Sequence, residues 1–224
     1  MNMPARRDNS SAAAGTTLVL GMGGTGVSFA RYLAARGARA MFADTRAFPP
    51  GMAAIRAAMP GAAILGNGVP ASLPAGVDRV VVSPGVDLHL PVLAEARQRG
   101  VPVLSDIDLF VAEATAPITA VTGSNGKSTV TSMVGAMLEA AGVTAGVGGN
   151  LGTPALELLA PDVRHYVLEL SSFQLERSAP VPTASAVVLN VTPDHLDIHG
   201  DMAAYTAAKA RIYARCQLAV VNRD

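Results

Sequence analysis

AVTGSNGKSTV, residues 120–130, is the most informative stretch of this sequence. It is similar to a phosphate-binding loop, whose general pattern is G-x-x-x-x-G-K-[ST]. Gly126, Lys127 and Ser128 fit the end of that pattern, but Val121 stands where the first glycine belongs, and the available glycine is Gly123. The stretch is therefore a chance match, a damaged loop, or a shorter loop that belongs to a particular enzyme class.

The surroundings of this loop favour a real phosphate site. A β-rich run, 118–122, precedes the loop, and a helical pattern from Lys127 to Ala141 follows it. Glycines would let backbone N–H groups converge on an anion, Lys127 would reach terminal phosphates, and Ser128 would ligate Mg²⁺. Further strands are expected near 166–169, 186–190 and 218–221. Because the chain reaches Asp224 directly behind the last of these strands, with no covering helix after it, we expect the second domain to be incomplete.

The N-terminal part of the chain predicts another α/β unit. A strand at 17–20 leads through glycines into a helix with Val27, Phe29, Ala30 and Leu33 facing inward, and a second strand covers 40–43. Strands at 63–65, 79–83 and 101–104, with a helix at 91–99, continue the alternation that is typical of a parallel sheet covered on both faces. We expect a disordered leader over residues 1–15, a Rossmann-like domain over 16–107, and a P-loop α/β domain over 108–224.

GMGGTG, residues 21–26, fits the G-x-G-x-x-G pattern, and it lies between a predicted strand and a predicted helix. Asp44 ends the next strand, about 20 residues on, where a ribose-binding acid belongs. On these residues alone the loop binds NAD(P) or a flavin, binds another nucleotide, or is a glycine turn without a ligand. A phosphate loop in the second domain disfavours an NAD-dependent oxidoreductase, because hydride transfer has no use for one.

Composition excludes several other classes. Half of the 224 residues are hydrophobic and 15% are charged, so the chain can build a sizeable core. Formal net charge is zero, which gives no sign of a nucleic acid or membrane partner. The single cysteine, Cys216, fits a reducing compartment. With no apolar run of signal-peptide or membrane-helix length, we expect a soluble, cytoplasmic monomer.

Later segments supply residues that a Mg·ATP site would need. Glu169, in YVLELSSFQLE, ends an apolar strand at the sheet edge where α/β proteins bind ligands. His195 lies among acids in LNVTPDHLDIHG, although a solvated loop histidine is the commoner outcome. Lys209 lies in the helical YTAAKARIYAR, where an ordinary surface lysine is the simplest interpretation. GVGGNLGTP, residues 146–154, has glycines dense enough to suggest close approach to a ligand.

Taken together these segments resemble the Mur ligase family, and most closely its glutamate-adding branch. TGSNGKST is similar to that family's short form of the phosphate loop, and GGNLGTPAL, YVLELSSFQLE, NVTPDHLDIHG and YTAAKARIY follow in family order. DTR (44–46), SPG (83–85) and DIDLF (106–110) match the family's N-terminal half. The resemblance extends from about Thr16 to Asp224.

The resemblance implies roles for particular residues. The ATP phosphates would be held by the loop residues Gly123, Ser124, Asn125, Gly126, Lys127, Ser128 and Thr129. Metal ligands would be Ser128, Glu169, His195 and, if carbamylated, Lys209; the catalytic set would be Lys127, Glu169, His195 and Lys209. The UDP-muramoyl substrate would contact Gly24, Thr25, Asp44, Thr45, Arg46, Gly85, Asn150, Ser171, Gln174 and His195.

The resemblance also implies the reaction. Using ATP and Mg²⁺, the family would phosphorylate the carboxylate of UDP-N-acetylmuramoyl-L-alanine to an acyl phosphate, which the amine of glutamate attacks, in peptidoglycan precursor synthesis. The family has a third domain and a longer central domain, which these 224 residues do not match. We therefore expect the chain by itself to be inactive in ligation; the alternative is a non-catalytic fragment that binds the UDP-muramoyl substrate.

Overall fold

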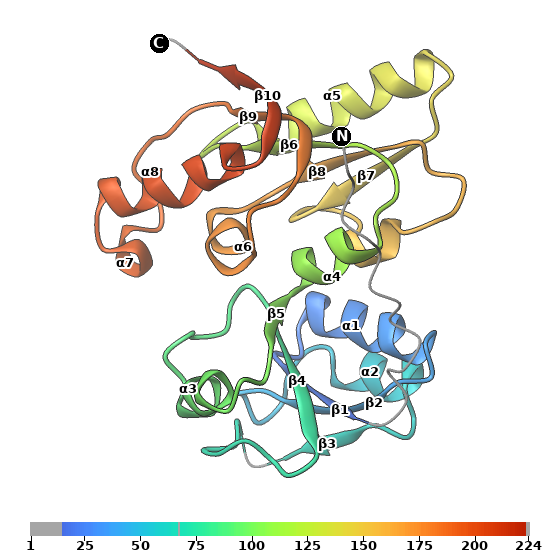
Figure 1. Cartoon of the computed structure of the whole chain (residues 1–224), viewed down its shortest axis with the longest axis vertical. Helices are drawn as coiled ribbons and strands as arrows, with labels where there is room; N and C mark the ends of the chain where they lie inside the picture. The colour runs from blue at the N-terminus through green and yellow to red at the C-terminus, as the bar shows by residue number, and fades with distance from the viewer. Residues whose placement is uncertain (1–14, 67, 223–224) are drawn as a thin grey trace. The chain divides into compact units, whose positions relative to one another are not determined.

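The computed structural model describes residues 15–66 and 68–222, so nearly all of the predicted leader, residues 1–15, lies outside the described residues. The chain divides into two compact units (Figure 1). Unit 1 comprises Met1–Val82 and Val86–Val103, and unit 2 comprises Ser83–Gly85 and Leu104–Asp224. Each unit is built on a parallel sheet, as predicted.

Unit 1 carries a five-stranded sheet in the order β3-β2-β1-β4-β5, with β1 parallel to both of its neighbours. Its elements are β1 (Thr16–Leu20), α1 (Gly24–Ala34), β2 (Arg39–Ala43), α2 (Met52–Ala58), β3 (Ala63–Leu65), β4 (Val77–Val82), α3 (Pro91–Gln98) and β5 (Val103–Ser105). The strand order reverses at β1, and ligands of open α/β sheets bind at the carboxyl ends of strands at such a point. The glycine loop follows β1 at that end.

Helix α1 packs closely on the sheet because of one glycine. A Cβ at Gly26 would stand 2.3 Å from the carbonyl oxygen of Gly21, so only glycine fits there. Phe29, Ala30 and Leu33 are buried as predicted. Val27 is half-buried, and its side chain lies against Gly51 at the start of α2. Ser28, which we did not predict to face inward, is buried. A polar residue on the inner face cannot be recognised from hydrophobic spacing.

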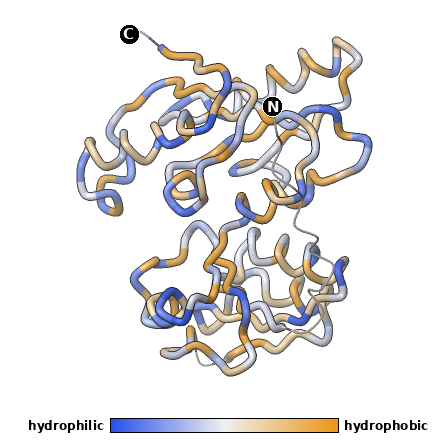
Figure 2. The backbone as a smooth tube through the Cα atoms, viewed as in Figure 1, coloured by the Kyte–Doolittle hydropathy of each residue, from blue (hydrophilic) through white to orange (hydrophobic). Residues whose placement is uncertain are grey.

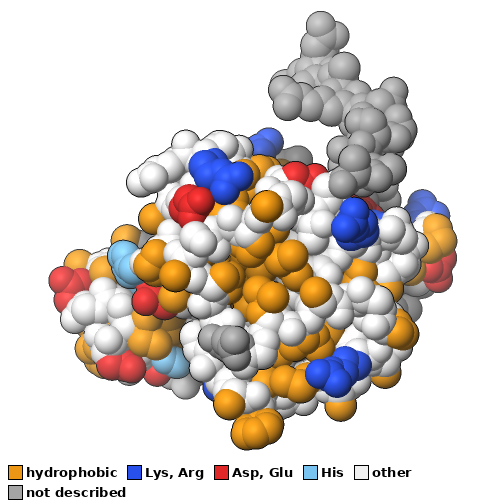
Figure 3. All heavy atoms as spheres, turned by 90° about the horizontal axis from the view of Figure 1, so that it is seen from below, with side chains coloured by type: hydrophobic (Ala, Val, Ile, Leu, Met, Phe, Trp, Pro, Cys, Tyr) orange, Lys and Arg blue, Asp and Glu red, His pale blue; other side chains and the backbone are white. Residues whose placement is uncertain are grey.

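A hydrophobic core of unit 1 forms between the sheet and α3. Val92, Leu93 and Ala96 of α3 are fully buried against Leu18, Val80 and other strand residues. Figure 2 shows hydrophobic segments along these strands, and Figure 3 shows hydrophobic side chains gathered on a face of unit 1. Partly buried side chains pack against this core: Met41, Leu65, Val69, Val86, Leu88, Leu90, Val101 and Val103.

Unit 2 carries a second parallel sheet in the order β10-β9-β6-β8-β7. Its elements are α4 (Asp106–Glu113), β6 (Ile118–Thr122), α5 (Lys127–Ala140), β7 (Ala145–Gly149), η1 (Ala155–Leu158), β8 (His165–Glu169), α6 (Ser172–Arg177), β9 (Thr183–Val188), α7 (Leu196–His199), α8 (Met202–Ala210), η2 (Arg211–Tyr213) and β10 (Cys216–Val221). Figure 1 shows α5 on one face of this sheet and α6 and α8 on the other.

The order of strands in unit 2 brings several predicted site residues to one edge of the sheet. Strand β6 lies at the centre, between β8 and β9, and the phosphate loop leaves its carboxyl end. The neighbouring strands run parallel to β6, so their carboxyl ends bring Glu169 and the residues after Val188 to the same edge. This edge is where open parallel sheets bind ligands.

The glycine-rich segment at residues 146–154 begins within strand β7. Residues 145–149 form β7, which pairs with β8. Close approach of this segment to a ligand stays a prediction. A Cβ at Gly148 would stand 2.2 Å from the carbonyl oxygen of Thr153, and one at Gly149 would stand 2.4 Å from that of Glu169. Close backbone packing therefore accounts for both glycines.

None of the helices in the described ranges has the length and hydropathy needed to cross a bilayer.

Candidate nucleotide and metal site

The phosphate loop is shaped by its two glycines. Gly126 takes a left-handed conformation (φ 80°) as the N-cap of α5, and Gly123 has φ 157°. A Cβ at Gly123 would meet the Cβ of Leu189 at 3.1 Å, so the loop passes close to the segment that follows β9. The early turn at Gly123 explains why this loop has no glycine at Val121, which is a fully buried strand residue.

The segment after β9 holds the first half of the loop. The Ser124 amide donates to the Asn190 carbonyl (3.0 Å), and the Asn125 amide donates to Asn190 Oδ1 (2.9 Å). These two N–H groups are therefore occupied. Gly126 is the N-cap of α5 and residues 127–129 form its first turn. The first N–H groups of a helix have no partner within it. The amides that can receive phosphate are those of 126–129, reinforced by the positive end of the helix dipole.

Both lysines of the chain converge on one carbonyl oxygen. The sequence contains two lysines, Lys127 and Lys209. Lys127 Nζ donates to the Gly123 oxygen at 2.9 Å, and Lys209 Nζ donates to the same oxygen at 2.8 Å. Lys127 also donates to the Ser124 oxygen at 3.0 Å. Two positive charges thus lie against the loop that is expected to take phosphate.

Lys209 is not the surface lysine that its helix alone would suggest. It is 2% exposed, and its ammonium lies 4.5 Å from the ring centroid of Tyr205. Burial, and then the positive charge of Lys127, lower the pKa of Lys209 from 10.5 to about 8, while Asp194 acts in the opposite direction. Burial disfavours the charged form of an amine, so a neutral amine is more accessible here than in water.

Glu169 and Ser128 form the centre of a site that fits Mg²⁺. Glu169 is 2% exposed, and its carboxylate accepts from Ser128 Oγ and from Asn150 Nδ2, both at 2.8 Å. Both donors to this buried carboxylate are neutral groups, a hydroxyl and an amide. A hydroxyl and a carboxylate at the edge of a phosphate loop are typical Mg²⁺ ligands, with phosphate and water completing the shell. These residues therefore fit Mg²⁺ bound together with a nucleotide.

His195 lies at the turn before α7, and its role as a metal ligand stays a prediction. Its backbone is left-handed (φ 52°), and it is the one non-glycine residue with positive φ among the described residues. The ring lies 3.5 Å from Asp194 Oδ2 and 5.1 Å from the Phe173 ring. Within 15–66 and 68–222 no three or more His, Cys, Asp or Glu side chains gather as a metal site. A second metal involving His195 and Lys209 stays a prediction.

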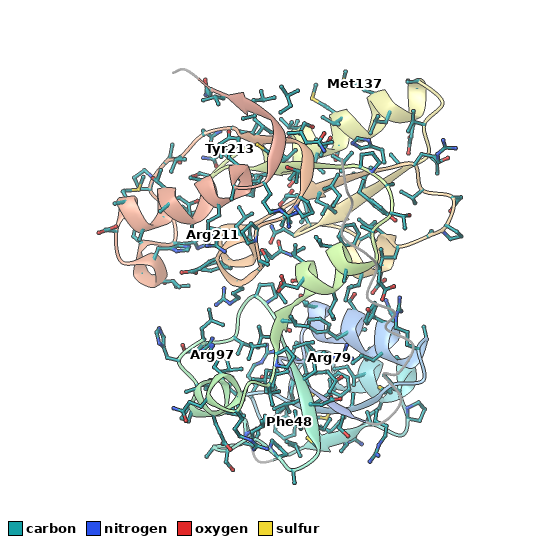
Figure 4. The ribbon with its side chains drawn as sticks, in the orientation of Figure 1. Phe48, Arg79, Arg97, Met137, Arg211 and Tyr213 are labelled. Atoms are coloured by element: carbon teal, nitrogen blue, oxygen red, sulfur yellow. The ribbon has the colours of Figure 1, made fainter. Side chains whose placement is uncertain are left out.

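Gln174 and Ser171 are engaged with each other at the start of α6. The two residues form a capping box, with the Ser171 side chain accepting from the Gln174 amide and Gln174 Oε1 accepting from the Ser171 amide. Gln174 Nε2 donates to Asp106 Oδ2 at 2.9 Å. Arg211, labelled in Figure 4, donates to the carbonyl oxygens of Leu175 and Ser178. These bonds hold α6 in place, and direct contact of Gln174 with a substrate stays a prediction.

Unit 1 presents its own candidate site at the glycine loop. Asp44 is 5% exposed; it accepts from the Met22 amide (2.7 Å), the Arg46 amide, and the Arg46 guanidinium (2.8 Å to each oxygen). The Arg46 guanidinium holds the pKa of the Asp44 carboxyl well below its ordinary value, against the effect of burial. Asp44 thus ties the loop after β2 to the glycine loop, while Gly24 and Thr45 are exposed and Thr25 is half-buried. Gly85, which belongs to unit 2, is exposed.

Comparison with known sequences decides the family. Residues 15–105 match the MurD-like N-terminal domain of Mur ligases, and residues 121–224 match the Mur ligase middle domain. The chain belongs to the Mur ligase family. The match confirms the resemblance seen in the phosphate loop and in the segments after it.

Individual relatives agree with this assignment. The chain is 50% identical over 214 residues to the UDP-N-acetylmuramoylalanine–D-glutamate ligase of Nitrosococcus oceani, which covers 94% of this chain and 47% of the relative. It is 48% identical over 206 residues to the ligase of the same name from Pseudomonas aeruginosa, covering 92% and 46%. This Mur ligase chain therefore spans about half the length of the curated relatives it matches.

Solved structures confirm the fold. UDP-N-acetylmuramate:L-alanyl-gamma-D-glutamyl-meso-diaminopimelate ligase from Neisseria meningitides superposes with a TM-score of 0.62 at 20% identity, covering 94% of this chain and 72% of that one. UDP-N-acetylmuramate–alanine ligase from Thermotoga maritima gives 0.56 at 24% identity, covering 92% and 48%. Both share the two-unit α/β fold of this Mur ligase chain.

Several residues of the site were not singled out by sequence. Asn190 holds the loop amides, Tyr205 contacts both the loop and Lys209, and Asp106 anchors Gln174. Tyr205 lies four residues before Lys209, so helical spacing could have placed them on one face. No local pattern predicts the contacts of Asn190 and Asp106, because their partners lie 65 and 68 residues away in the chain.

Asp106 generates a prediction about pH and stability. The residue is 4% exposed, its Oδ1 has no hydrogen-bond partner among the described residues, and burial raises its pKa from 3.8 to about 6, against the Gln174 bond. A raised pKa means that the folded state prefers the protonated acid. Stability is therefore lost as pH rises from about 4 to 6, by about 3 kcal/mol in all.

We predict that Asp106→Asn, which keeps an oxygen for Gln174 but removes the charge, raises the free energy of unfolding at pH 8 and raises it by only about a third as much at pH 4.5. Urea unfolding at both pH values measures the difference. Asp162→Asn, which removes one exposed carboxylate, reports the effect of net charge alone. An equal effect of Asp106→Asn at the two pH values would contradict the account.

Proposed function

We propose that this chain supplies the ATP-binding and UDP-substrate-binding parts of a ligase that adds D-glutamate to UDP-N-acetylmuramoyl-L-alanine in peptidoglycan precursor synthesis. Relatives that are 50% and 48% identical to this chain in sequence carry the name of that ligase. The observation that carries the proposal is the arrangement at the head of α5: Ser128 bonded to the buried Glu169, beside Lys127. Within the proposal, unit 1 holds the uridine nucleotide and unit 2 holds Mg·ATP.

The chemistry gives each residue of unit 2 a task. A carboxylate is a poor electrophile, so transfer of the γ-phosphoryl group of ATP to the substrate carboxylate makes an acyl phosphate. The amine of glutamate then attacks the acyl carbon, the amide bond forms, and inorganic phosphate leaves. The amides of 126–129 would hold the phosphates and Lys127 would move onto them; Ser128 and Glu169 would hold Mg²⁺, which supplies charge neutralisation when bound.

Unit 1 supports a uridine nucleotide better than a dinucleotide. An NAD site needs a free carboxylate at the end of the second strand to accept from the ribose hydroxyls. Both oxygens of Asp44 are occupied by Met22 and Arg46. We propose that Asp44 shapes the pocket, and that exposed Thr45, Arg46, Gly24 and Gly85, with Thr25, contact the uridine diphosphate. The muramoyl end of the substrate would lie near Asn150, Ser171, Gln174 and His195.

ATP and UDP-sugars are cytoplasmic metabolites, so we propose a cytoplasmic protein.

We predict that Lys127→Ala weakens binding of Mg·ATP to this chain by about 10- to 100-fold, because a charged hydrogen-bond donor to phosphate is lost. Isothermal titration at low salt measures the dissociation constant. Arg164→Ala removes an exposed cation of the same unit and should leave the constant within twofold of the parent. Near-parental affinity of Lys127→Ala would remove the phosphate loop from the proposal.

We also propose that Lys209 is carbamylated. A neutral amine reacts with CO₂, forming an N–C bond and releasing a proton, and the product carboxylate would relieve the repulsion between Lys209 and Lys127. Because the chain has two lysines, the prediction is easily read. Protein in ¹³C-bicarbonate should give one lysine carbamate NMR signal that Lys209→Arg abolishes; a signal that persists in this variant contradicts the assignment.

A further inference from the structure

The hydroxyl of Ser124, the second residue of the phosphate loop, has three close partners. Ser124 Oγ donates to the Thr192 carbonyl at 3.0 Å and accepts from the Thr192 amide at 3.0 Å. Its third partner is the hydroxyl of Tyr205, also at 3.0 Å. A serine hydroxyl has one proton and two lone pairs. Because the proton and one lone pair are used by Thr192, Tyr205 must donate to the remaining lone pair.

Tyr205 is well placed to act as a fixed donor. It is 1% exposed, and burial raises the pKa of its hydroxyl, so the proton stays on the oxygen. The ring is held by His199 at 5.3 Å between centroids, and His199 is in turn stacked on Phe173 at 5.1 Å. Tyr205 is therefore the third protein partner of the Ser124 hydroxyl, beside the carbonyl and the amide of Thr192.

Helix α8 presents two groups to consecutive residues of the loop. Tyr205 donates to the side chain of Ser124, and Lys209, one turn later, donates to the carbonyl of Gly123. The Lys209 ammonium also lies over the Tyr205 ring. The Ser124 carbonyl accepts from Lys127, so a change in the orientation of Ser124 moves an acceptor of the phosphate-binding lysine.

We propose that Tyr205 is a positioning residue for the phosphate loop, whose hydroxyl orients Ser124 so that Lys127 and the amides of 126–129 face the nucleotide phosphates. The inference rests on the proposed function, since it assumes that the loop takes Mg·ATP. Tyr205 itself does not touch the phosphates: its hydroxyl is spent on Ser124. Its contribution therefore acts on affinity through the conformation of residues 123–126.

A pair of matched variants tests the proposal. Tyr205→Phe removes the donor to Ser124. Tyr213→Phe removes another phenolic hydroxyl of unit 2, which accepts from the Val188 amide (2.8 Å) and donates to the Val220 carbonyl (2.7 Å); Tyr213 is labelled in Figure 4. We expect Tyr205→Phe to weaken Mg·ATP binding about five- to tenfold, the effect of one lost hydrogen bond, and Tyr213→Phe to leave it within twofold.

Thermal melts of the three proteins separate this effect from loss of fold. The proposal predicts that the two variants lose comparable stability, while the loss of affinity is confined to Tyr205→Phe. Equal weakening of binding by both variants, or parental affinity in Tyr205→Phe, would overturn it. Titration with UDP, which the proposed function assigns to unit 1, should be unchanged in both variants.

Hydrogen exchange tests the same inference without nucleotide. The amides of Ser124 and Asn125 are bonded to Asn190, so they report on the loop directly. In Tyr205→Phe we expect these amides to exchange about five- to tenfold faster than in the parent or in Tyr213→Phe; unchanged exchange contradicts the inference. If the parent does not bind Mg·ATP, the proposed function fails for this chain, and the exchange result still decides the role of Tyr205.

Discussion

The carbonyl oxygen of Gly123 is the point on which the second unit depends. It accepts from Lys127 and from Lys209, the only lysines of the sequence, and so brings two positive charges to one loop. Like charges this close repel, and the repulsion contributes to the lowered pKa of Lys209. An arriving phosphate would relieve that repulsion by drawing Lys127 away. The loop is thus held in a form that favours binding of an anion.

The sheet makes this convergence possible. Because β6 lies between β8 and β9, its loop has Glu169 on one side and Asn190 on the other. Asn190 occupies the early loop amides and leaves those at the head of α5 for phosphate. Glu169 accepts a hydrogen bond from Ser128 at the same edge. From α8, Tyr205 bonds to Ser124 and Lys209 bonds to the carbonyl of Gly123. Each element contributes a contact that the others need.

Local patterns predicted the parts of the molecule that depend on neighbouring residues. The strands before Gly21 and Gly123, the helix from Lys127, and the position of Glu169 at a strand end all follow from short-range signals, and the structure has them. Short elements such as α6, with six residues, and β7, with three glycines, carry too weak a pattern to be recognised. The shortened loop itself was informative once the later segments were considered with it.

Contacts between distant segments could not be predicted in the same way. The burial of Lys209, the bond from the Met22 amide to Asp44, and the bond from Gln174 to Asp106 all depend on how the chain folds back on itself. Lys209 shows the difference most clearly, because its helix is typical of a surface helix while its environment is buried. The family resemblance, not its local sequence, singled out this residue.

A crystal structure of this chain with Mg·ADP tests the central claim most directly. The account predicts the β-phosphate on the amides of 126–129, the metal between Ser128 and Glu169, and Lys127 Nζ moved from the Gly123 oxygen to phosphate. Nucleotide bound elsewhere, or phosphate at the loop with Lys127 still on Gly123, would contradict it.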